Sequence, residues 1–231
     1  MEQIELLEKA LKIEGISILP EMIDQFSKYR ELLVLWNQKI NLISRKDENR
    51  IISRHFLGSL GLIKTILFPF GTTVLDLGTG AGFPGIPLKI IRPDIQLLLV
   101  ESKHKKILFL QMIIEELNLS NIEIMPGRME EIGETLTPVH FVISRSVTDL
   151  VNLMKWSSNY FDPKDGILVA IKGPTVREEL KRLCKVASGF GITEWQLERY
   201  NPFPSVMQLK ETYIVVIQKS TPPRQILLIH K

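Results

Sequence analysis

Residues 74–85 read Val-Leu-Asp-Leu-Gly-Thr-Gly-Ala-Gly-Phe-Pro-Gly and combine a short apolar run, one carboxylate and four glycines. The apolar run is typical of a buried strand, and the glycines allow a sharp turn from that strand into a helix. Such a turn aims free backbone N–H groups at a ligand that binds at the helix N-terminus. The stretch therefore predicts a nucleotide-binding loop at the end of a strand.

The segments on either side of this loop carry different hydrophobic patterns. Residues 1–68 are expected to be helical, because apolar side chains recur every three or four positions from Met22 to Ile40 and from Ile51 to Leu67. From residue 72 onward, short β-rich runs alternate with helical stretches, which is typical of a parallel sheet. The expected strands are residues 72–77, 95–100, 122–125, 139–144, 166–171, 194–200 and 212–218. The expected helices between them are residues 84–91, 103–118, 149–161 and 174–187.

These patterns predict an α/β fold with a mostly parallel seven-stranded sheet, helices on both of its faces and a helical N-terminal extension. We expect the extension to cover residues 1–68 and the ligand-binding domain residues 72–218. The last two strands are expected to close the sheet as a hairpin. Residues 219–231 are expected to form a tail.

Composition limits the class of protein. The chain has 231 residues, of which 45% are hydrophobic and 24% charged, enough to bury a full core. Residues 1–10 carry three glutamates and resemble no targeting signal, and no run approaches the length of a membrane span. The single cysteine, Cys184, fits a reducing compartment. The sequence thus predicts a cytoplasmic protein with no membrane contact and no metal.

The net charge is only +3, yet basic residues gather in three places: residues 45–54, 103–106 and 172–185. Clusters of this kind can bind phosphates, although each can also be an ordinary solvated surface.

Three ligands compete for the glycine loop. A phosphate-binding P-loop ends in Gly-Lys-Ser/Thr, whereas the corresponding stretch here is Phe83-Pro84-Gly85-Ile86, which has no lysine to reach a phosphate. A dinucleotide is harder to exclude, since residues 80–85 satisfy G-x-G-x-x-G and Glu101 follows about 20 residues later, as that fingerprint expects. Asp76 distinguishes the remaining two, because a carboxylate repels a pyrophosphate and attracts the sulfonium and ammonium of S-adenosylmethionine. The charge therefore favours the methyl donor.

Both acids also have a structural interpretation. Glu101, at the end of the second expected strand, can accept hydroxyls of a ribose or cap the helix that follows. Asp76 can attract the donor or satisfy N–H groups of its own loop.

Motifs along nearly the whole chain resemble one family, the bacterial small-subunit ribosomal RNA guanine-N7 methyltransferases, also called the glucose-inhibited division protein B family. The motifs are Leu35-Trp36-Asn37, Asn41-Leu42, Arg54-His55-Phe56, residues 74–85, Glu101-Ser102-x-x-Lys105-Lys106, Gly127-Arg128-Met129-Glu130-Glu131, Ile143-Ser144-Arg145 and Ile171-Lys172-Gly173. Only the glycine loop is distinctive alone. Their order and spacing carry the resemblance.

The resemblance implies a Rossmann-like class I methyltransferase with S-adenosyl-L-methionine as its donor. It implies as acceptor a guanine of 16S rRNA, position 527 in standard bacterial numbering, presented by the RNA or the small ribosomal subunit, with no stable protein partner. The donor contacts that it implies, together with the loop residues considered above, are Asp76, Gly78, Gly80, Phe83, Glu101, Met129, Glu130 and Arg145. Guanine N7 attacks with an in-plane lone pair, so no catalytic general base is needed.

The acceptor side is less determined. Arg145 is a candidate for orienting the guanine or a phosphate, and it can also anchor the donor. The expected RNA contacts are Arg45, Arg54, His55 and Lys172. Gly58 stands where the family usually has an aspartate, and the C-terminal tail is apolar where relatives are often basic.

Two other functions stay open from the sequence. One is a methyltransferase-fold RNA-binding or assembly factor without turnover, for which the missing acid at position 58 is the indication. The other is an NAD-type oxidoreductase, which would bind a dinucleotide and not S-adenosylhomocysteine.

Overall fold

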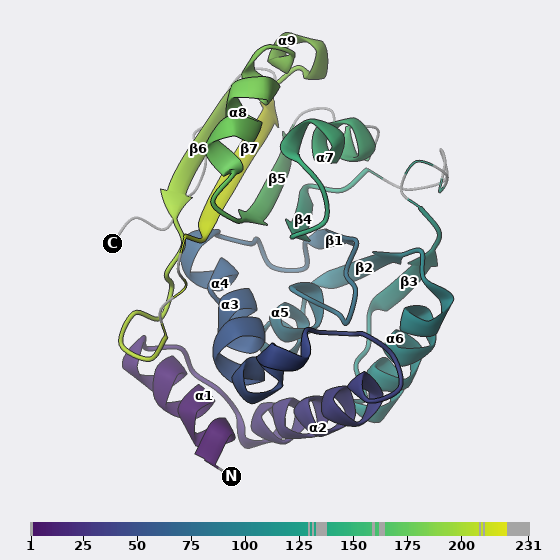
Figure 1. Cartoon of the computed structure of the whole chain (residues 1–231), viewed down its shortest axis with the longest axis vertical. Helices are drawn as coiled ribbons and strands as arrows, with labels where there is room; N and C mark the ends of the chain where they lie inside the picture. Colours follow the sequence, from purple (N-terminus) through teal and green to yellow (C-terminus); the bar gives the residue numbers. More distant parts are fainter. Residues whose placement is uncertain are drawn as a thin grey trace.

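The computed structural model describes residues 2–128, 130, 132, 138–158, 160, 161, 165–207, 209 and 211–220. A seven-stranded sheet with the order β3-β2-β1-β4-β5-β7-β6 crosses the molecule (Figure 1). The strands are β1 (Thr73–Leu77), β2 (Gln96–Glu101), β3 (Ile122–Pro126), β4 (Phe141–Arg145), β5 (Asp165–Lys172), β6 (Glu194–Arg199) and β7 (Tyr213–Ser220). Strands β1 to β5 run parallel, whereas β7 is antiparallel to β5 and to β6. The predicted mostly parallel sheet is confirmed.

The centre of the sheet is buried on both faces. In β1, the three apolar side chains Val74, Leu75 and Leu77 are at most 2% exposed, although they point alternately to opposite faces. A continuous apolar run of this kind is what a central parallel strand requires. The topology therefore places the end of β1, and the glycine loop that follows it, in the middle of the sheet edge.

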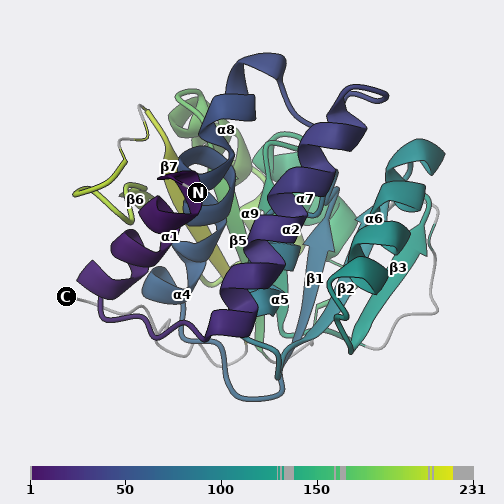
Figure 2. The ribbon, with the colours of Figure 1, turned by 90° about the horizontal axis from the view of Figure 1, so that it is seen from below.

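Helices cover both faces, as predicted. The core on one face joins the N-terminal helices to α5 (Gly85–Ile91) and α6 (His104–Glu116), and Figure 2 shows α1 and α2 lying in front of the sheet. The core on the other face joins α7 (Leu150–Ser157) and α8 (Val176–Cys184) to the sheet. A short helix, α9 (Ala187–Phe190), leads to β6.

The N-terminal segment contains α1 (Glu2–Ile13) and α2 (Pro20–Asn37). Pro20 begins α2 at a position whose backbone N–H would have no partner within the helix, so its missing N–H costs no hydrogen bond. The single helix expected from Ile51 to Leu67 is instead divided into three pieces: the π-helix η2 (Ile51–Leu57), α3 (Gly58–Leu60) and α4 (Leu62–Thr65). The 3₁₀ helix η1 (Arg45–Arg50) precedes them. Gly61 lies between α3 and α4. Only glycine fits there, because a Cβ would be 2.3 Å from the Tyr200 hydroxyl.

The C-terminal boundary also differs from expectation. Lys219 and Ser220 belong to β7, where Lys219 pairs with Gly166, and residues 221–231 of the expected tail lie outside the described residues. Among the residues described, no helix is long and apolar enough to cross a membrane.

Candidate active site

The carboxylate of Asp76, at the end of β1, holds the glycine loop on the side of the sheet. Its Oδ2 accepts hydrogen bonds from the Thr79 hydroxyl at 2.7 Å and from the Gly85 backbone N–H at 2.8 Å. A Cβ on Gly85 would lie 2.7 Å from the same oxygen, so only glycine fits there. Asp76 is fully buried, and this burial raises its pKa to about 7, while the two hydrogen bonds act in the opposite direction. The structure thus gives Asp76 a role in holding the loop, and its contact with the donor stays a prediction.

The loop is held from above by aromatic side chains of the N-terminal helices. The Tyr29 hydroxyl of α2 donates to the Ala81 carbonyl at 2.5 Å. Phe83 stacks on Tyr29, with 5.6 Å between ring centroids, and on His55, with 4.9 Å. The Phe83 side chain therefore packs into this cluster, and it is absent from the described lining of the cavity beside the loop. The sequence marked Tyr29 only as part of a core stripe.

His55 lies inside this aromatic cluster rather than on the surface. It is only 9% exposed, and burial, followed by the positive charges of Arg145, Arg54 and Arg50, lowers its pKa to about 3. A neutral imidazole that is buried and stacked on Phe83 packs as a part of the core, and its expected contact with RNA stays a prediction. The apolar residues around His55 in the sequence were the signal for its burial. A single histidine does not by itself show which face of a helix it occupies.

A cavity of about 220 Å³ opens beside the loop at the ends of β1, β2 and β3. Its described lining is Leu77, Gly78, Val100, Glu101, Ser102, Gly127, Arg128, Glu130, Val147 and Trp156. Three predicted donor residues, Gly78, Glu101 and Glu130, are therefore brought together. Gly78 has φ +70°, and a Cβ there would lie 2.6 Å from Val147, so glycine keeps this wall open. Met129 lies outside the described residues.

Glu101 is the carboxylate best placed for a ribose. Its Oε2 accepts a hydrogen bond from the Gly80 N–H at 3.0 Å, and its Oε1 accepts one from the Lys103 N–H at 2.8 Å. Each carboxylate oxygen has a second lone-pair site, so both can still accept ribose hydroxyls. Gly80 itself serves to orient Glu101. A carboxylate that is fixed by two backbone N–H groups at the end of β2 fits the ribose of S-adenosylmethionine, the chemistry that the sequence predicts.

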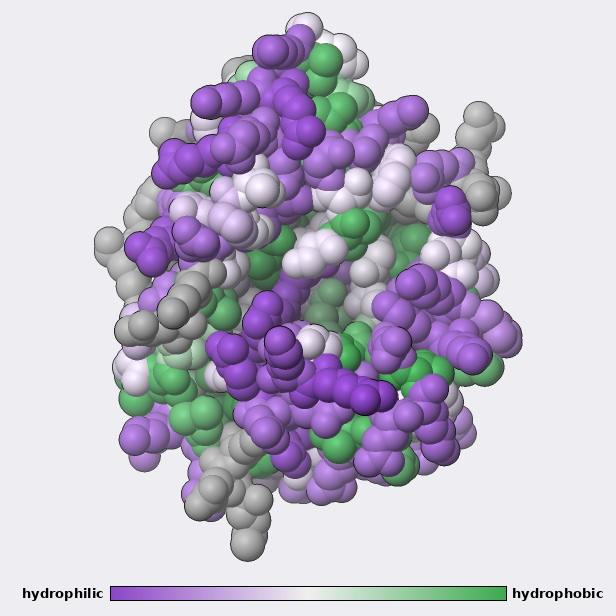
Figure 3. All heavy atoms as spheres, in the orientation of Figure 1, coloured by the Kyte–Doolittle hydropathy of each residue, from purple (hydrophilic) through white to green (hydrophobic). Residues whose placement is uncertain are grey.

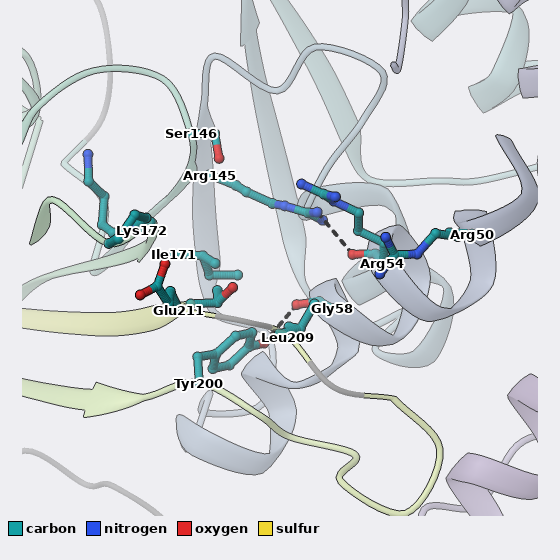
Figure 4. A pocket seen from close by; sticks show the side chains of 13 residues that line it. Arg50, Arg54, Gly58, Arg145, Ser146, Ile171, Lys172, Tyr200, Leu209 and Glu211 are labelled. Atoms are coloured by element: carbon teal, nitrogen blue, oxygen red, sulfur yellow. Dashed lines mark hydrogen bonds between the residues drawn. The ribbon is translucent and has the colours of Figure 1, made fainter. Parts of the chain in front are cut away.

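A second cavity of about 450 Å³ lies at the ends of β4 and β5 (Figure 4). Its described lining is Arg50, Arg54, Gly58, Arg145, Ser146, Ile171, Lys172, Gly173, Pro174, Tyr200, Leu209, Glu211 and Thr212. The predicted RNA contacts Arg54 and Lys172 both belong to it, whereas Arg45 is exposed and lines neither cavity. Hydrophilic side chains surround a hollow in the middle of this face (Figure 3).

Arg145 extends from the end of β4 into the wall of the larger cavity, not of the smaller one. Its Nη2 donates to the Arg54 carbonyl at 2.9 Å, whereas its buried Nη1 has no hydrogen-bond partner among the described residues. Burial lowers the pKa of its guanidinium to about 10, so Arg145 stays charged near neutral pH. A Cβ on Gly58 would have one neighbour within 4 Å, Arg145 Nη1 at 3.7 Å. Gly58 thus leaves this nitrogen without the acid that the resemblance implied.

Lys172 is already engaged within the protein. Its Nζ lies 2.7 Å from Glu179 Oε2 and also donates to the Thr148 carbonyl. Figure 4 shows the amino group turned away from Arg145. The ion pair joins β5 to α8 and the segment after β4, so Lys172 shapes the cavity rather than offering an unpaired charge to a phosphate.

The two cavities meet at the segment that follows β4. Arg145 and Ser146 line the larger cavity, and Val147, the next residue, lines the smaller one. Strands β1 and β4 are neighbours at the point where the strand order reverses, which is where open α/β sheets bind their ligands. Two substrates bound in these cavities would face each other across residues 145–147.

Comparisons with known proteins find relatives that cover most of the chain. Ribosomal RNA small subunit methyltransferase G of Chlorobium chlorochromatii is 41% identical over 214 residues, 90% of each chain. The protein of that name from Clostridium kluyveri is 34% identical over 183 residues, which cover 78% of this chain and 77% of the relative.

Solved structures share the fold at low sequence identity. Precorrin-6y C5,15-methyltransferase of Geobacter metallireducens has a TM-score of 0.53 at 11% identity and covers 78% of this chain and 91% of its own. M. jannaschii TYW2 in complex with AdoMet has a TM-score of 0.54 at 13% identity and covers 78% of both chains. The fold is thus the predicted Rossmann-like class I methyltransferase fold.

A model of the family described as rRNA small subunit methyltransferase G matches residues 22–199, more than half of the chain. The chain therefore belongs to the rRNA small subunit methyltransferase G family.

Proposed function

We propose that this protein transfers the methyl group of S-adenosyl-L-methionine to N7 of a guanine in 16S rRNA, at position 527 in standard bacterial numbering. Membership of the rRNA small subunit methyltransferase G family carries the proposal. The two adjoining cavities support it, since one holds a ribose-binding carboxylate and the other is lined by arginines. Acting on rRNA or on the small subunit, the protein works in the cytoplasm.

The smaller cavity is the donor side. Glu101 accepts the ribose hydroxyls, and the wall formed by Gly78 and Val147 lies close to the acceptor. S-adenosylmethionine, when bound, supplies an electrophilic methyl group on a sulfonium. Asp76 and Tyr29 support the donor site by holding the backbone of the loop, and the Gly80 N–H orients Glu101. The Phe83 ring packs against Tyr29 and fixes the far side of the loop.

The larger cavity is the acceptor side. Arg145, at the boundary between the cavities, orients the guanine or its phosphate, and the N–H groups of its fork favour either. S-adenosylmethionine, held on the donor side, would supply the methyl carbon that the N7 lone pair attacks, and its sulfur would keep the electron pair of the broken C–S bond. No proton leaves N7, so the reaction needs no general base.

Orientation is then the main source of rate. Holding N7 in line with the methyl group removes about 7–11 kcal/mol from the barrier of the bimolecular reaction. The chain achieves this with a loop that is braced on both sides and with an arginine bonded to the backbone of the N-terminal helices.

The proposal is tested with purified protein, labelled S-adenosylmethionine and small ribosomal subunits from cells that lack the gene. We expect stoichiometric transfer to one guanine N7. Donor binding without transfer would instead support an RNA-binding or assembly factor without turnover. Binding of NAD in place of S-adenosylhomocysteine would support an oxidoreductase.

A further inference from the structure

A third cavity, of about 200 Å³, adjoins the acceptor cavity and extends it outward. Its described lining is Arg50, Ser53, Arg54, Val206, Met207 and Leu209, and three of these residues, Arg50, Arg54 and Leu209, also line the acceptor cavity. Shared walls make the two cavities one groove. It runs from Arg145 outward between the helical segment 50–54 and the connection between β6 and β7.

One wall of this groove is cationic. The exposed guanidinium of Arg50 forms no hydrogen bond or ion pair with another described residue. The Arg54 side chain is 46% exposed and has one ionic contact, from Nη1 to Asp47 Oδ1 at 3.1 Å. Because the Arg54 carbonyl accepts from Arg145, this wall is fixed to the end of β4. The Arg50 charge is thus unpaired among the described residues, and Arg54, unlike the buried Lys172, keeps an exposed guanidinium beside its Asp47 contact. Both are accessible to a phosphate and held at a set place relative to the acceptor cavity.

The opposite wall is apolar and anchored. Its residues Val206, Met207 and Leu209 follow Phe203, a fully buried ring that the Lys64 amino group approaches to 4.9 Å from the centroid. The Tyr200 hydroxyl at the start of this connection donates to the Gly58 carbonyl at 2.8 Å. The wall is therefore tied to the N-terminal helices before any ligand binds.

A phosphate and a base side by side match these two walls. Grooves that bind single-stranded nucleic acid combine a positive face for the backbone with side chains that contact the faces of the bases, most often aromatic ones. Here the corresponding side chains are aliphatic, so the bases gain apolar contact rather than ring stacking. The groove also opens directly into the cavity proposed for the target guanine, so a chain that enters it is continuous with the target nucleotide.

We infer that this groove binds the single-stranded RNA next to the target guanine, with a phosphate on Arg50 and Arg54 and the adjacent base packed on Leu209 and Val206. The inference rests on the proposed function and specifies where its RNA substrate lies. Neither the family assignment nor the sequence motifs place the connection between β6 and β7 in contact with RNA.

The test compares Arg50→Ala and Leu209→Ala with Arg182→Ala, a control that removes one charge from α8, away from the groove. Methyl transfer to small subunits from cells lacking the gene is measured at several salt concentrations. We expect both groove variants to raise KM for the RNA about tenfold, because Arg50→Ala loses a charged contact with phosphate and Leu209→Ala loses apolar contact with the base. Arg50→Ala is expected also to reduce the salt slope of RNA binding by about 0.7. Affinity for S-adenosylhomocysteine stays at the wild-type value in all three variants.

Leu209→Met keeps the apolar wall, so it is expected to restore the wild-type KM, and thermal melting shows that each variant folds. If the wild type methylates the RNA but both groove variants match Arg182→Ala, the groove assignment is overturned while the proposed function stands. If KM for the RNA is unchanged in the groove variants and an acidic peptide competes for the groove, the groove would be assigned to a protein partner. Failure of the wild type to transfer a methyl group would instead overturn the proposed function.

Discussion

Replacing Glu101 with glutamine changes one oxygen of the donor cavity and little else. Both carboxylate oxygens accept backbone N–H groups, from Gly80 at 3.0 Å and from Lys103 at 2.8 Å. A glutamine has one accepting oxygen, so its NH₂ group must face one of these donors. The ribose hydroxyls then also lose a charged acceptor.

The expected loss follows from hydrogen bonds to charged groups, which contribute about 1.5–3 kcal/mol each. Losing one such bond to the ribose weakens donor affinity about 10- to 150-fold. Calorimetric titration with S-adenosylhomocysteine measures the change. Glu115→Gln, an exposed acid of α6, is the matched control and is expected to bind like the wild type.

KM for the RNA is expected to stay unchanged in Glu101→Gln, because the acceptor cavity does not include this residue. A donor affinity within about twofold of the wild type would refute the assignment of Glu101 to the ribose. A parallel loss of RNA affinity would show that the two cavities are not separate sites.

Three further predictions concern the loop itself. Tyr29→Phe removes the hydrogen bond to the buried Ala81 carbonyl and is expected to lower the free energy of unfolding by about 1–3 kcal/mol in urea, and an unchanged midpoint would refute this brace. Gly78→Ala places a Cβ 2.6 Å from Val147 at φ +70°, and is expected to weaken donor binding and lower Tm, so a variant that binds normally would contradict the proposed wall. Because the pKa of Asp76 is raised to about 7, the folded protein holds a proton there that the unfolded chain has released, and the unfolding free energy falls by up to about 4 kcal/mol as pH rises from about 4 to 7. Asp76→Asn is expected to flatten that dependence, and parallel pH profiles for the two proteins would argue against it.

The sequence predicted the sheet well because each strand carries its own signal. Apolar runs such as residues 95–100 and the glycine loop at 78–85 reflect local backbone requirements, which suffice to locate seven strands along the chain. The order of the strands in the sheet comes from the structure. The sequence also placed Gly78 and Glu101 at strand ends, where ligands gather in such folds, and both residues line the smaller cavity.

The contacts that the sequence did not reveal depend on the direction of a side chain and on partners far away in the chain. From its position in the sequence, the carboxylate of Asp76 can face either the ligand or its own loop. The structure shows it accepting the Gly85 N–H of the loop. The partner of Lys172 is Glu179, on the next helix, which no spacing rule reveals. The wall that contains Leu209 has no motif, because its position arises from anchoring by Tyr200 to helices about 140 residues earlier in the chain.

The most direct test of the account is the methylation state of one nucleotide. 16S rRNA is isolated from cells with and without the gene and mapped by mass spectrometry, and the gene is restored as wild type or as Glu101→Gln. The account predicts that a single N7-methylguanosine, at position 527 in standard bacterial numbering, disappears without the gene and returns with the wild type. It also predicts a lower occupancy with Glu101→Gln. An N7-methylguanosine that persists without the gene, or a loss at a different atom or nucleotide, would contradict it.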